Sequence, residues 1–278
     1  MTPIHLGLVV EAATVSRRAV TEIAAALQRQ LARDVAPIWG VHATIDVFVS
    51  LEHVPPGYWP ILVADNYPGP ESIGIHLDLD GQPFSLVEAS PSWSLALSHE
   101  VIEMVTDPWG NRLVPGGSPM EGQGLVDILV EICDPCGGAG FAYTVNGYLV
   151  SDFCTPNYYD PVAAPGVRYS FTGGLDGPRR VGEGGYLSWR EPATGDWWQC
   201  DRIQRPELSF RRLGRLDDDG RPIRERVDER TPMVQLYTGT SRNDPALRAA
   251  YERRASTRVA SQARAAAIRR RMTDLGLR

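Results

Sequence analysis

The chain has 278 residues and a formal net charge of -6, with 43% hydrophobic and 22% charged residues. This composition is ordinary for a globular protein with one sizeable domain and appendages, or with two small domains. The negative charge argues against nucleic acid as a partner of the whole molecule. The N-terminus has no basic segment followed by an apolar one, and no apolar run is long enough to span a bilayer. We therefore expect a cytoplasmic protein with no membrane partner.

The N-terminal part of the chain predicts a sheet with one early helix. The strands are expected where apolar or alternating runs contain β-branched residues, and the helix where apolar residues recur at helical spacing. In chain order, the expected elements are a strand at 4–10, a helix at 14–33 and strands at 41–49, 59–65, 73–78 and 84–87. The expected fold class is α+β, with a mixed sheet of element order β-α-β-β-β-β.

Residues 93–108 predict one helix that carries a polar seam. His99, Glu103 and Asp107 are spaced four residues apart, so they lie on one helix face, while apolar residues cover most of the remaining surface. Buried carboxylates and imidazoles are costly unless they are paired or bound to a cation. A metal ion is the simplest such partner. Asp107 precedes Pro108, and we favour its interpretation as a turn residue that ends the helix.

The rest of the chain predicts shorter elements. Segment 125–136 is apolar but includes Glu131 and Asp134, and Asn146-Gly147 is a strong type I′ turn signal between strands at 141–145 and 148–150. Short β-like pieces and glycine-rich turns follow. We expect a main domain over 1–162, a small β-rich subdomain or embellishment over 163–240, and an arginine- and alanine-rich helix over 241–278.

The C-terminal segment is strongly basic. From Arg242 onward it has ten arginines against three acidic residues. Because charge runs are usually solvated faces, we expect this helix to pack on the acidic body of its own chain. The alternative is docking on an acidic protein surface or nucleic acid.

The sequence His99-Glu100-Val101-Ile102-Glu103 resembles the His-Glu-x-x-His helix of the zincin metallopeptidases, with glutamate in place of the second histidine. In zincins a sheet with the element order expected here precedes this helix. The resemblance covers roughly residues 4–160. It implies that His99 and Glu103 are zinc ligands and that Glu100 is the general base that acts on the metal-bound water.

A third ligand is expected downstream of the helix. No histidine follows His99, so the choice is between carboxylates and thiolates. In a gluzincin-like scheme, which the resemblance implies, Glu131 completes the site and Asp134 orients His99 or serves as a ligand itself. Asp107 and Asp152 are the other carboxylate candidates.

Tyrosines in the segments after the helix are candidates for stabilising an oxyanion. They are Tyr143, Tyr148, Tyr158 and Tyr159, and the sequence does not choose among them, although we take Tyr158 as the working assignment. His76 is a further residue of interest, because the edge strand of a zincin borders the substrate cleft.

One interpretation without a catalytic metal competes with this one. His99, Glu103, Glu131 and Asp134 would then form a buried hydrogen-bond network around an arginine such as Arg112. The cysteines offer a separate possibility, a structural zinc ion, but the usual second C-x-x-C pair is missing, so buried thiols or a local disulfide are expected instead. The four cysteines are Cys133, Cys136, Cys154 and Cys200.

The sequence therefore predicts a zinc-dependent hydrolase, most simply a metallopeptidase with a peptide or protein substrate, in which Glu100 activates a metal-bound water. The alternative is a non-catalytic zincin-like protein that binds a partner through the β-rich part and the basic C-terminal helix.

Overall fold

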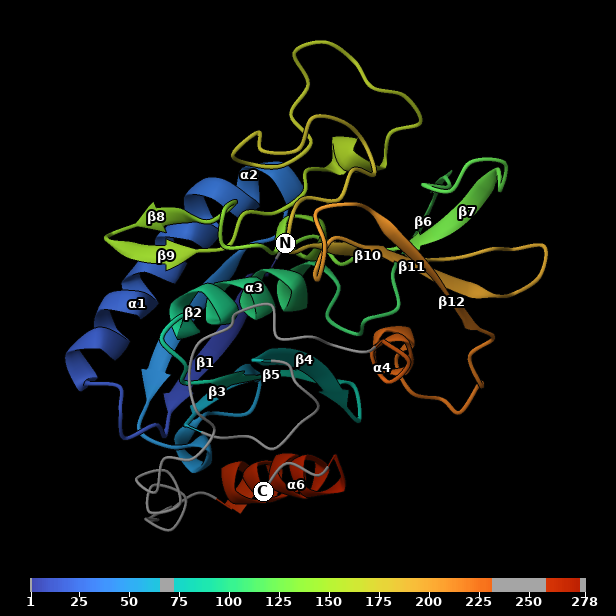
Figure 1. Cartoon of the computed structure of the whole chain (residues 1–278). Coiled ribbons are helices and arrows are strands. Elements are labelled where there is room, and N and C mark those ends of the chain that lie inside the picture. The colour runs from blue at the N-terminus through green and yellow to red at the C-terminus, as the bar shows by residue number, and fades with distance from the viewer. Residues whose placement is uncertain (1, 66–72, 232–258, 276–278) are drawn as a thin grey trace.

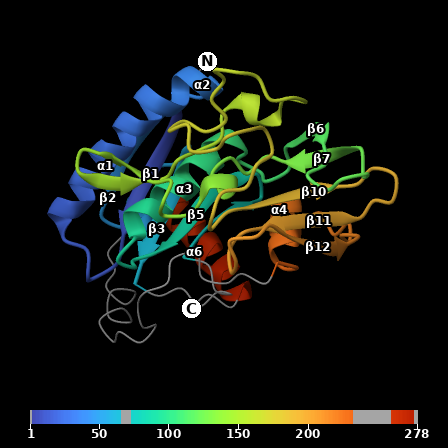
Figure 2. The ribbon, with the colours of Figure 1, turned by 45° about the horizontal axis from the view of Figure 1, so that its top comes forward.

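The structure is a computed structural model, and it describes residues 2–65, 73–231 and 259–275 of the chain. Its architecture is α+β, as expected from the sequence, with two five-stranded sheets that lie side by side (Figures 1 and 2).

The first sheet contains the N-terminal strands in the order β2-β1-β3-β5-β4. The strands are β1 (Ile4–Val10), β2 (Ala43–Phe48), β3 (Tyr58–Ala64), β4 (Gly74–Leu79) and β5 (Gln82–Glu88). β4 is an edge strand that runs antiparallel to β5, and the other neighbours are parallel. The element order predicted from the sequence is confirmed.

Helices cover both faces of the first sheet (Figure 1). The described helices are α1 (Arg17–Gln30), α2 (Ala36–Trp39), α3 (Trp93–Thr106), α4 (Ile223–Asp228) and α6 (Val259–Asp274). α1 and α3 share the main hydrophobic core with Leu6 and Leu8 of β1. Val9 of β1 belongs to a second core, together with Ile268 and Met272 of α6. Because successive strand residues point to opposite faces, β1 joins both cores.

The early helical segment begins and ends later than the predicted range of 14–33. α1 begins after Ser16, whose hydroxyl accepts a hydrogen bond from the main-chain N–H of Ala19. A π-helical turn (Leu31–Val35) links α1 directly to α2, which ends at Gly40 with φ of 68°. Glycine adopts this left-handed conformation without a steric cost and therefore ends the helix.

α3 follows β5 and ends where the sequence predicts. Asp107 closes the helix: its main-chain N–H donates to the carbonyl of Glu103, and its Oδ2 accepts from the main-chain N–H of Arg112 at 2.7 Å. The interpretation of Asp107 as a helix terminator is confirmed.

The second sheet is antiparallel, with strand order β12-β11-β10-β7-β6. Its strands are β6 (Leu113–Gly117), β7 (Leu125–Leu129), β10 (Tyr186–Arg190), β11 (Trp197–Asp201) and β12 (Ser209–Gly214). β10 pairs with β7 through Trp189 opposite Ile128. The sheet therefore joins strands from both sides of the boundary expected near residue 162.

A small hairpin consists of β8 (Tyr143–Val145) and β9 (Tyr148–Val150). Asn146 and Gly147 both have positive φ, 51° and 84°, as a type I′ turn requires. The predicted hairpin is confirmed.

The described part of the C-terminal segment packs on its own chain, as expected. Besides its apolar contacts, α6 donates from Arg269 to Glu11 at 2.8 Å and pairs Arg271 with Glu225 of α4. The predicted helix between 241 and 258 lies outside the described residues. Within the described ranges, no helix combines the length and apolarity needed to cross a bilayer.

Candidate metal centre

α3 carries three ionisable side chains into the interior of the protein. His99, Glu100 and Glu103 are exposed by only 5%, 4% and 1%. The helix contacts β4 and β5 on the sheet side and β9 on another side, so its polar residues are enclosed with its apolar ones. Because water does not reach these groups, each needs a partner inside the protein.

The first donor group, called the His99 group here, consists of His99, Glu103 and Asp134. The Nε2 atom of His99 lies 3.2 Å from Oε2 of Glu103 and 3.1 Å from Oδ1 of Asp134. Helical spacing brings the first two together, and a short 3-10 turn (Asp134–Cys136) presents the third. The main-chain N–H of Cys133 donates to Oε1 of Glu103 at 3.0 Å and fixes that carboxylate. One donor atom from each residue lies within 4.8 Å of the others, which is compatible with one shared ion.

The second donor group, the His76 group, consists of His76, Glu103 and Glu131, whose donor atoms also lie within 4.8 Å of one another. His76 comes from the edge strand β4, and its Nδ1 is 3.9 Å from Oε2 of Glu103. The four ligand candidates from the sequence are thus divided. Asp134 joins His99, Glu131 joins His76, and Glu103 belongs to both groups.

Several buried atoms in these groups have no hydrogen-bond partner among the described residues. They are Nδ1 of His99, Oε2 of Glu103, Oδ2 of Asp134 and both carboxylate oxygens of Glu131. A buried polar atom without a partner costs on the order of 1–3 kcal/mol, and more if it is charged. The residues that carry these atoms offer nitrogen and oxygen donors within 4.8 Å of one another, which fits the coordination chemistry of a divalent cation such as zinc.

Glu100 lies beside both groups but belongs to neither. Its Oε2 is 3.4 Å from Nδ1 of His76 and 3.6 Å from a guanidinium nitrogen of Arg224. A Cβ atom at Gly74 of β4 would lie 2.7 Å from Oε1 of Glu100. The glycine therefore makes room for this carboxylate.

Arg224 of α4 is the cation at the site that sequence reasoning missed. It is 5% exposed, and its guanidinium lies 3.6 Å from Glu103, 3.5 Å from Glu131 and 3.4 Å from Asp228. The arginine suggested by the sequence, Arg112, lies elsewhere, with its guanidinium 5.3 Å from the ring of Trp39. The charged segment around Arg224 resembles a solvated helix, so the sequence carried no signal for its burial.

Burial and neighbouring charges shift the pKa values of the donor groups. Burial disfavours the charged form of His99, but Glu103 and Asp134 outweigh it and hold the pKa of His99 well above its usual range. Burial and Glu103 raise the pKa of Asp134 to about 6. Burial raises the pKa of Glu131 well above its ordinary value, against the opposing effect of Arg224. A divalent cation would favour the deprotonated forms of all three.

The predicted oxyanion residue, Tyr158, does not face either donor group. Its hydroxyl donates to the carbonyl of Arg180 at 3.0 Å. The hydroxyls of Tyr143 and Tyr148 donate to Asp34 and Glu22. The hydroxyl of Tyr159 has no hydrogen-bond partner among the described residues, and after burial and Cys154, the carboxylates of Glu131 and Glu103 raise its pKa. Of these four tyrosines, Tyr159 is thus the one whose pKa is raised by both carboxylates.

The remaining ligand candidates have other roles. Asp152 accepts hydrogen bonds from Thr172 and from the main chain of Phe153, and Asp107 ends α3. The four cysteines are buried free thiols, as expected, and the described donor groups close enough to share an ion contain none of them.

Two small pockets border the site. One is lined by residues that include Leu129, Glu131, Asp134 and Asp228. The other is lined by His76, Trp109 and Arg224 among others. Residues of α4 form part of the wall of both.

No family model, curated protein or solved structure matches this chain.

Proposed function

We propose that this chain is a zinc-dependent hydrolase of peptide bonds, in which His99, Glu103 and Asp134 hold the ion and Glu100 is the general base. The observation that carries the proposal is the His99 group, three buried side chains with one donor atom each within 4.8 Å of the others. Each of them also has one atom without a hydrogen-bond partner among the described residues. One imidazole and two carboxylates are acceptable zinc ligands, and a cation satisfies them together.

A zinc ion in such a site acidifies water and polarises a carbonyl oxygen. Glu100 is adjacent to His99 in sequence, and its carboxylate, which contacts His76 and Arg224, is among the charges that raise the pKa of His99. It is therefore suited to accept the proton of the attacking water and to deliver it to the leaving amine. The hydrogen bond from the main-chain N–H of Cys133 to Glu103 holds one ligand in place during this transfer.

The resemblance of residues 99–103 to the zincin helix supports a peptide or protein as the substrate. The element order before α3 and the antiparallel edge strand β4 support the same choice.

The test is the substitution Glu100→Gln, which keeps the shape of the side chain and removes the base. We expect turnover of a peptide substrate library to fall by on the order of 100- to 10,000-fold, with zinc content and melting temperature close to those of the native chain. Full activity in this variant would refute the role of Glu100.

A second candidate function is that of a non-catalytic zincin-like protein that binds a partner through its β-rich part and C-terminal helix. The specific observation in its favour is the position of Arg224, a buried cation among the carboxylates of the site. A purified chain that contains no zinc, and whose melting temperature does not change in chelator, would favour this function over hydrolysis.

A further inference from the structure

The His76 group is occupied by a cation that belongs to the chain itself. The guanidinium of Arg224 contacts both ring nitrogens of His76 and lies 3.6 Å from Glu103 and 3.5 Å from Glu131. His76, Glu103 and Glu131 are the members of the His76 group, whose donor atoms lie close enough to share one ion. Arg224 therefore stands where an ion bound to this group would lie.

The guanidinium fits this position poorly. Its Nε atom has no hydrogen-bond partner among the described residues, nor do the two oxygens of Glu131 or Oε2 of Glu103. A guanidinium has five N–H donors and no acceptor, and it binds carboxylates best through two parallel hydrogen bonds. A neutral imidazole offers only one acceptor nitrogen, so His76 can accept a hydrogen bond from only one N–H group of the guanidinium. A compact ion would use the same oxygen and nitrogen atoms as ligands.

The charge of the site also favours a second ion. The carboxyl groups of Glu100, Glu103, Glu131 and Asp228 all lie within 3.6 Å of the guanidinium, which carries a single positive charge. Buried like charges repel one another strongly where the effective dielectric constant is low. A divalent ion would offset the charge of two deprotonated groups, whereas Arg224 offsets that of one.

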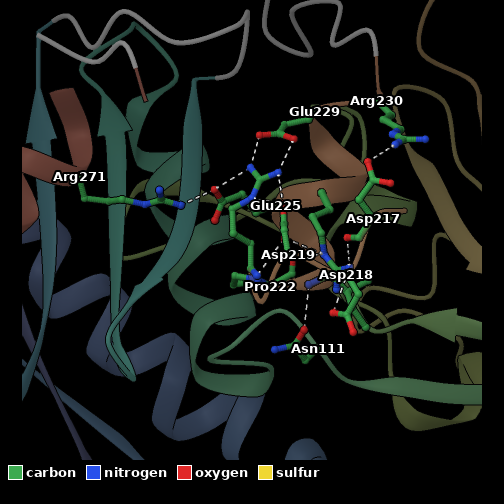
Figure 3. A network of polar contacts seen from close by, with 12 residues as sticks. Asn111, Asp217, Asp218, Asp219, Pro222, Glu225, Glu229, Arg230 and Arg271 are labelled. Atoms are coloured by element: carbon green, nitrogen blue, oxygen red, sulfur yellow. Dashed lines mark hydrogen bonds and ion pairs between the residues drawn. The ribbon is translucent and has the colours of Figure 1, made fainter. Parts of the chain in front are cut away.

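α4, which carries Arg224, is a short helix that spans only Ile223–Asp228. Two main-chain hydrogen bonds hold its start: Arg224 N–H donates to the carbonyl of Gly110 at 2.9 Å, and Ile223 N–H donates to Asn111 at 2.8 Å. Val227 holds its other end in a small core that it shares with the second sheet. Arg271 of α6 and Arg221 pair with Glu225, as Figure 3 shows for the network around this helix. Residues of α4 line both small pockets that border the site.

We propose that His76, Glu103 and Glu131 form a second divalent-cation site, and that Arg224 is a tethered competitor for it. An ion and the guanidinium exclude each other, so binding of the ion displaces the guanidinium and loosens α4, which carries it. The inference goes beyond the proposed hydrolase and does not require its chemistry, although both donor groups share Glu103.

The experiment measures Zn²⁺ binding by calorimetry in a His99→Ala background, which removes the first group from the comparison. We expect His99→Ala/Arg224→Met to bind Zn²⁺ at least about tenfold more tightly than His99→Ala alone, because the competitor is gone. Adding His76→Ala should abolish that gain. His99→Ala/Arg226→Met is the matched control, because it makes the same charge change on the same helix, where Arg226 bonds to the carbonyls of Pro222 and Asp217. An equal gain in the control, or a gain that survives His76→Ala, would overturn the proposal.

Hydrogen exchange of the unmodified chain tests the same proposal without a variant that has to fold. Saturating Zn²⁺ should accelerate amide exchange in the segment that contains α4 by roughly tenfold, because Arg224 loses its place, while α1 remains unchanged. Unchanged or slower exchange in α4 would overturn the proposal. If the His99 group failed to bind zinc, catalysis would be refuted, and the faster exchange of α4 would still be measurable.

Discussion

Glu100 keeps its position because residue 74 has no side chain. A Cβ atom at Gly74 would lie 2.7 Å from both Cγ and Oε1 of Glu100. We expect Gly74→Ala to displace the carboxylate and to lower kcat/KM by up to about 100-fold, with zinc content unchanged. Gly140→Ala is the matched control, because a Cβ atom there meets nothing within 4 Å. Equal activity in the two variants would contradict the positional role of Gly74.

Two buried carboxyl groups give the metal-free chain a defined pH dependence. Burial is the main cause that raises the pKa of Asp134 to about 6 and that of Asp228 to about 7, from the ordinary value of 3.8. At a pH between the unfolded and the folded pKa values, the folded state thus holds protons that the unfolded chain has released. The contribution of these protons to the free energy of unfolding is complete below the unfolded pKa and is lost as pH rises through the folded values.

With chelator present, we therefore expect the free energy of unfolding to increase by on the order of 2–4 kcal/mol as pH falls from about 8 to about 5. Asp134→Asn should reduce this increase, because the variant cannot titrate at that position. Urea denaturation at each pH measures it. Stability that decreases over this interval would contradict the buried, protonated state of the two groups.

Helical spacing in the sequence was sufficient to predict that His99 and Glu103 lie close together, since both lie on one helix face. It could not reveal Arg224, which contacts His76 across 148 positions of sequence. It also failed for Tyr158, because the direction of a phenol depends on the turn that carries it, Pro156–Tyr159. Contacts that form only through tertiary packing cannot be predicted from the spacing of residues in the sequence.

At the scale of elements, α6 stabilises the first sheet by covering its second face. Ile268 is 1% exposed in the core that it shares with Val9. We expect Ile268→Ala to cost about 2–5 kcal/mol, as truncation of a buried aliphatic side chain does. Arg270→Ala, at an exposed position of the same helix, should change stability by less than about 0.5 kcal/mol. Urea midpoints that coincide for the two variants would show that α6 does not hold this core together.

The elements of the first sheet were predictable because their apolar pattern is local and their turns have specific chemistry. Asn146-Gly147 shows the same for the hairpin, since both residues adopt the positive φ that a type I′ turn requires. The pairing of β10 with β7 was not predictable, because strands of similar pattern can pair with several partners. The π-helical link between α1 and α2 likewise has no signature in the spacing of apolar residues.

At the scale of the whole molecule, the site combines elements from both halves of the chain. α3 and β4 supply His99 and His76, the segment after β7 supplies Glu131 and Asp134, and α4 supplies Arg224. Trp189 of β10 is fully buried in the main core, so the second sheet shares that core with α1 and α3.

We expect Trp189→Ala to lower the stability of the whole chain by about 3–5 kcal/mol in one unfolding transition. Trp109→Ala is the control, because Trp109 is half exposed. Circular dichroism during thermal unfolding distinguishes the outcomes. Two separate transitions, of which only one shifts in Trp189→Ala, would show that the two sheets unfold independently.

The most direct measurement is the zinc content of the purified chain, compared with that of His99→Ala and of the exposed control His42→Ala. If the His99 group holds the ion, the native chain and His42→Ala should contain about one zinc ion per chain and lose melting temperature in chelator. His99→Ala should contain almost none, because Arg224 still competes for the His76 group. A native chain without zinc, or a His99→Ala variant that retains it, would contradict the assignment of this metal centre.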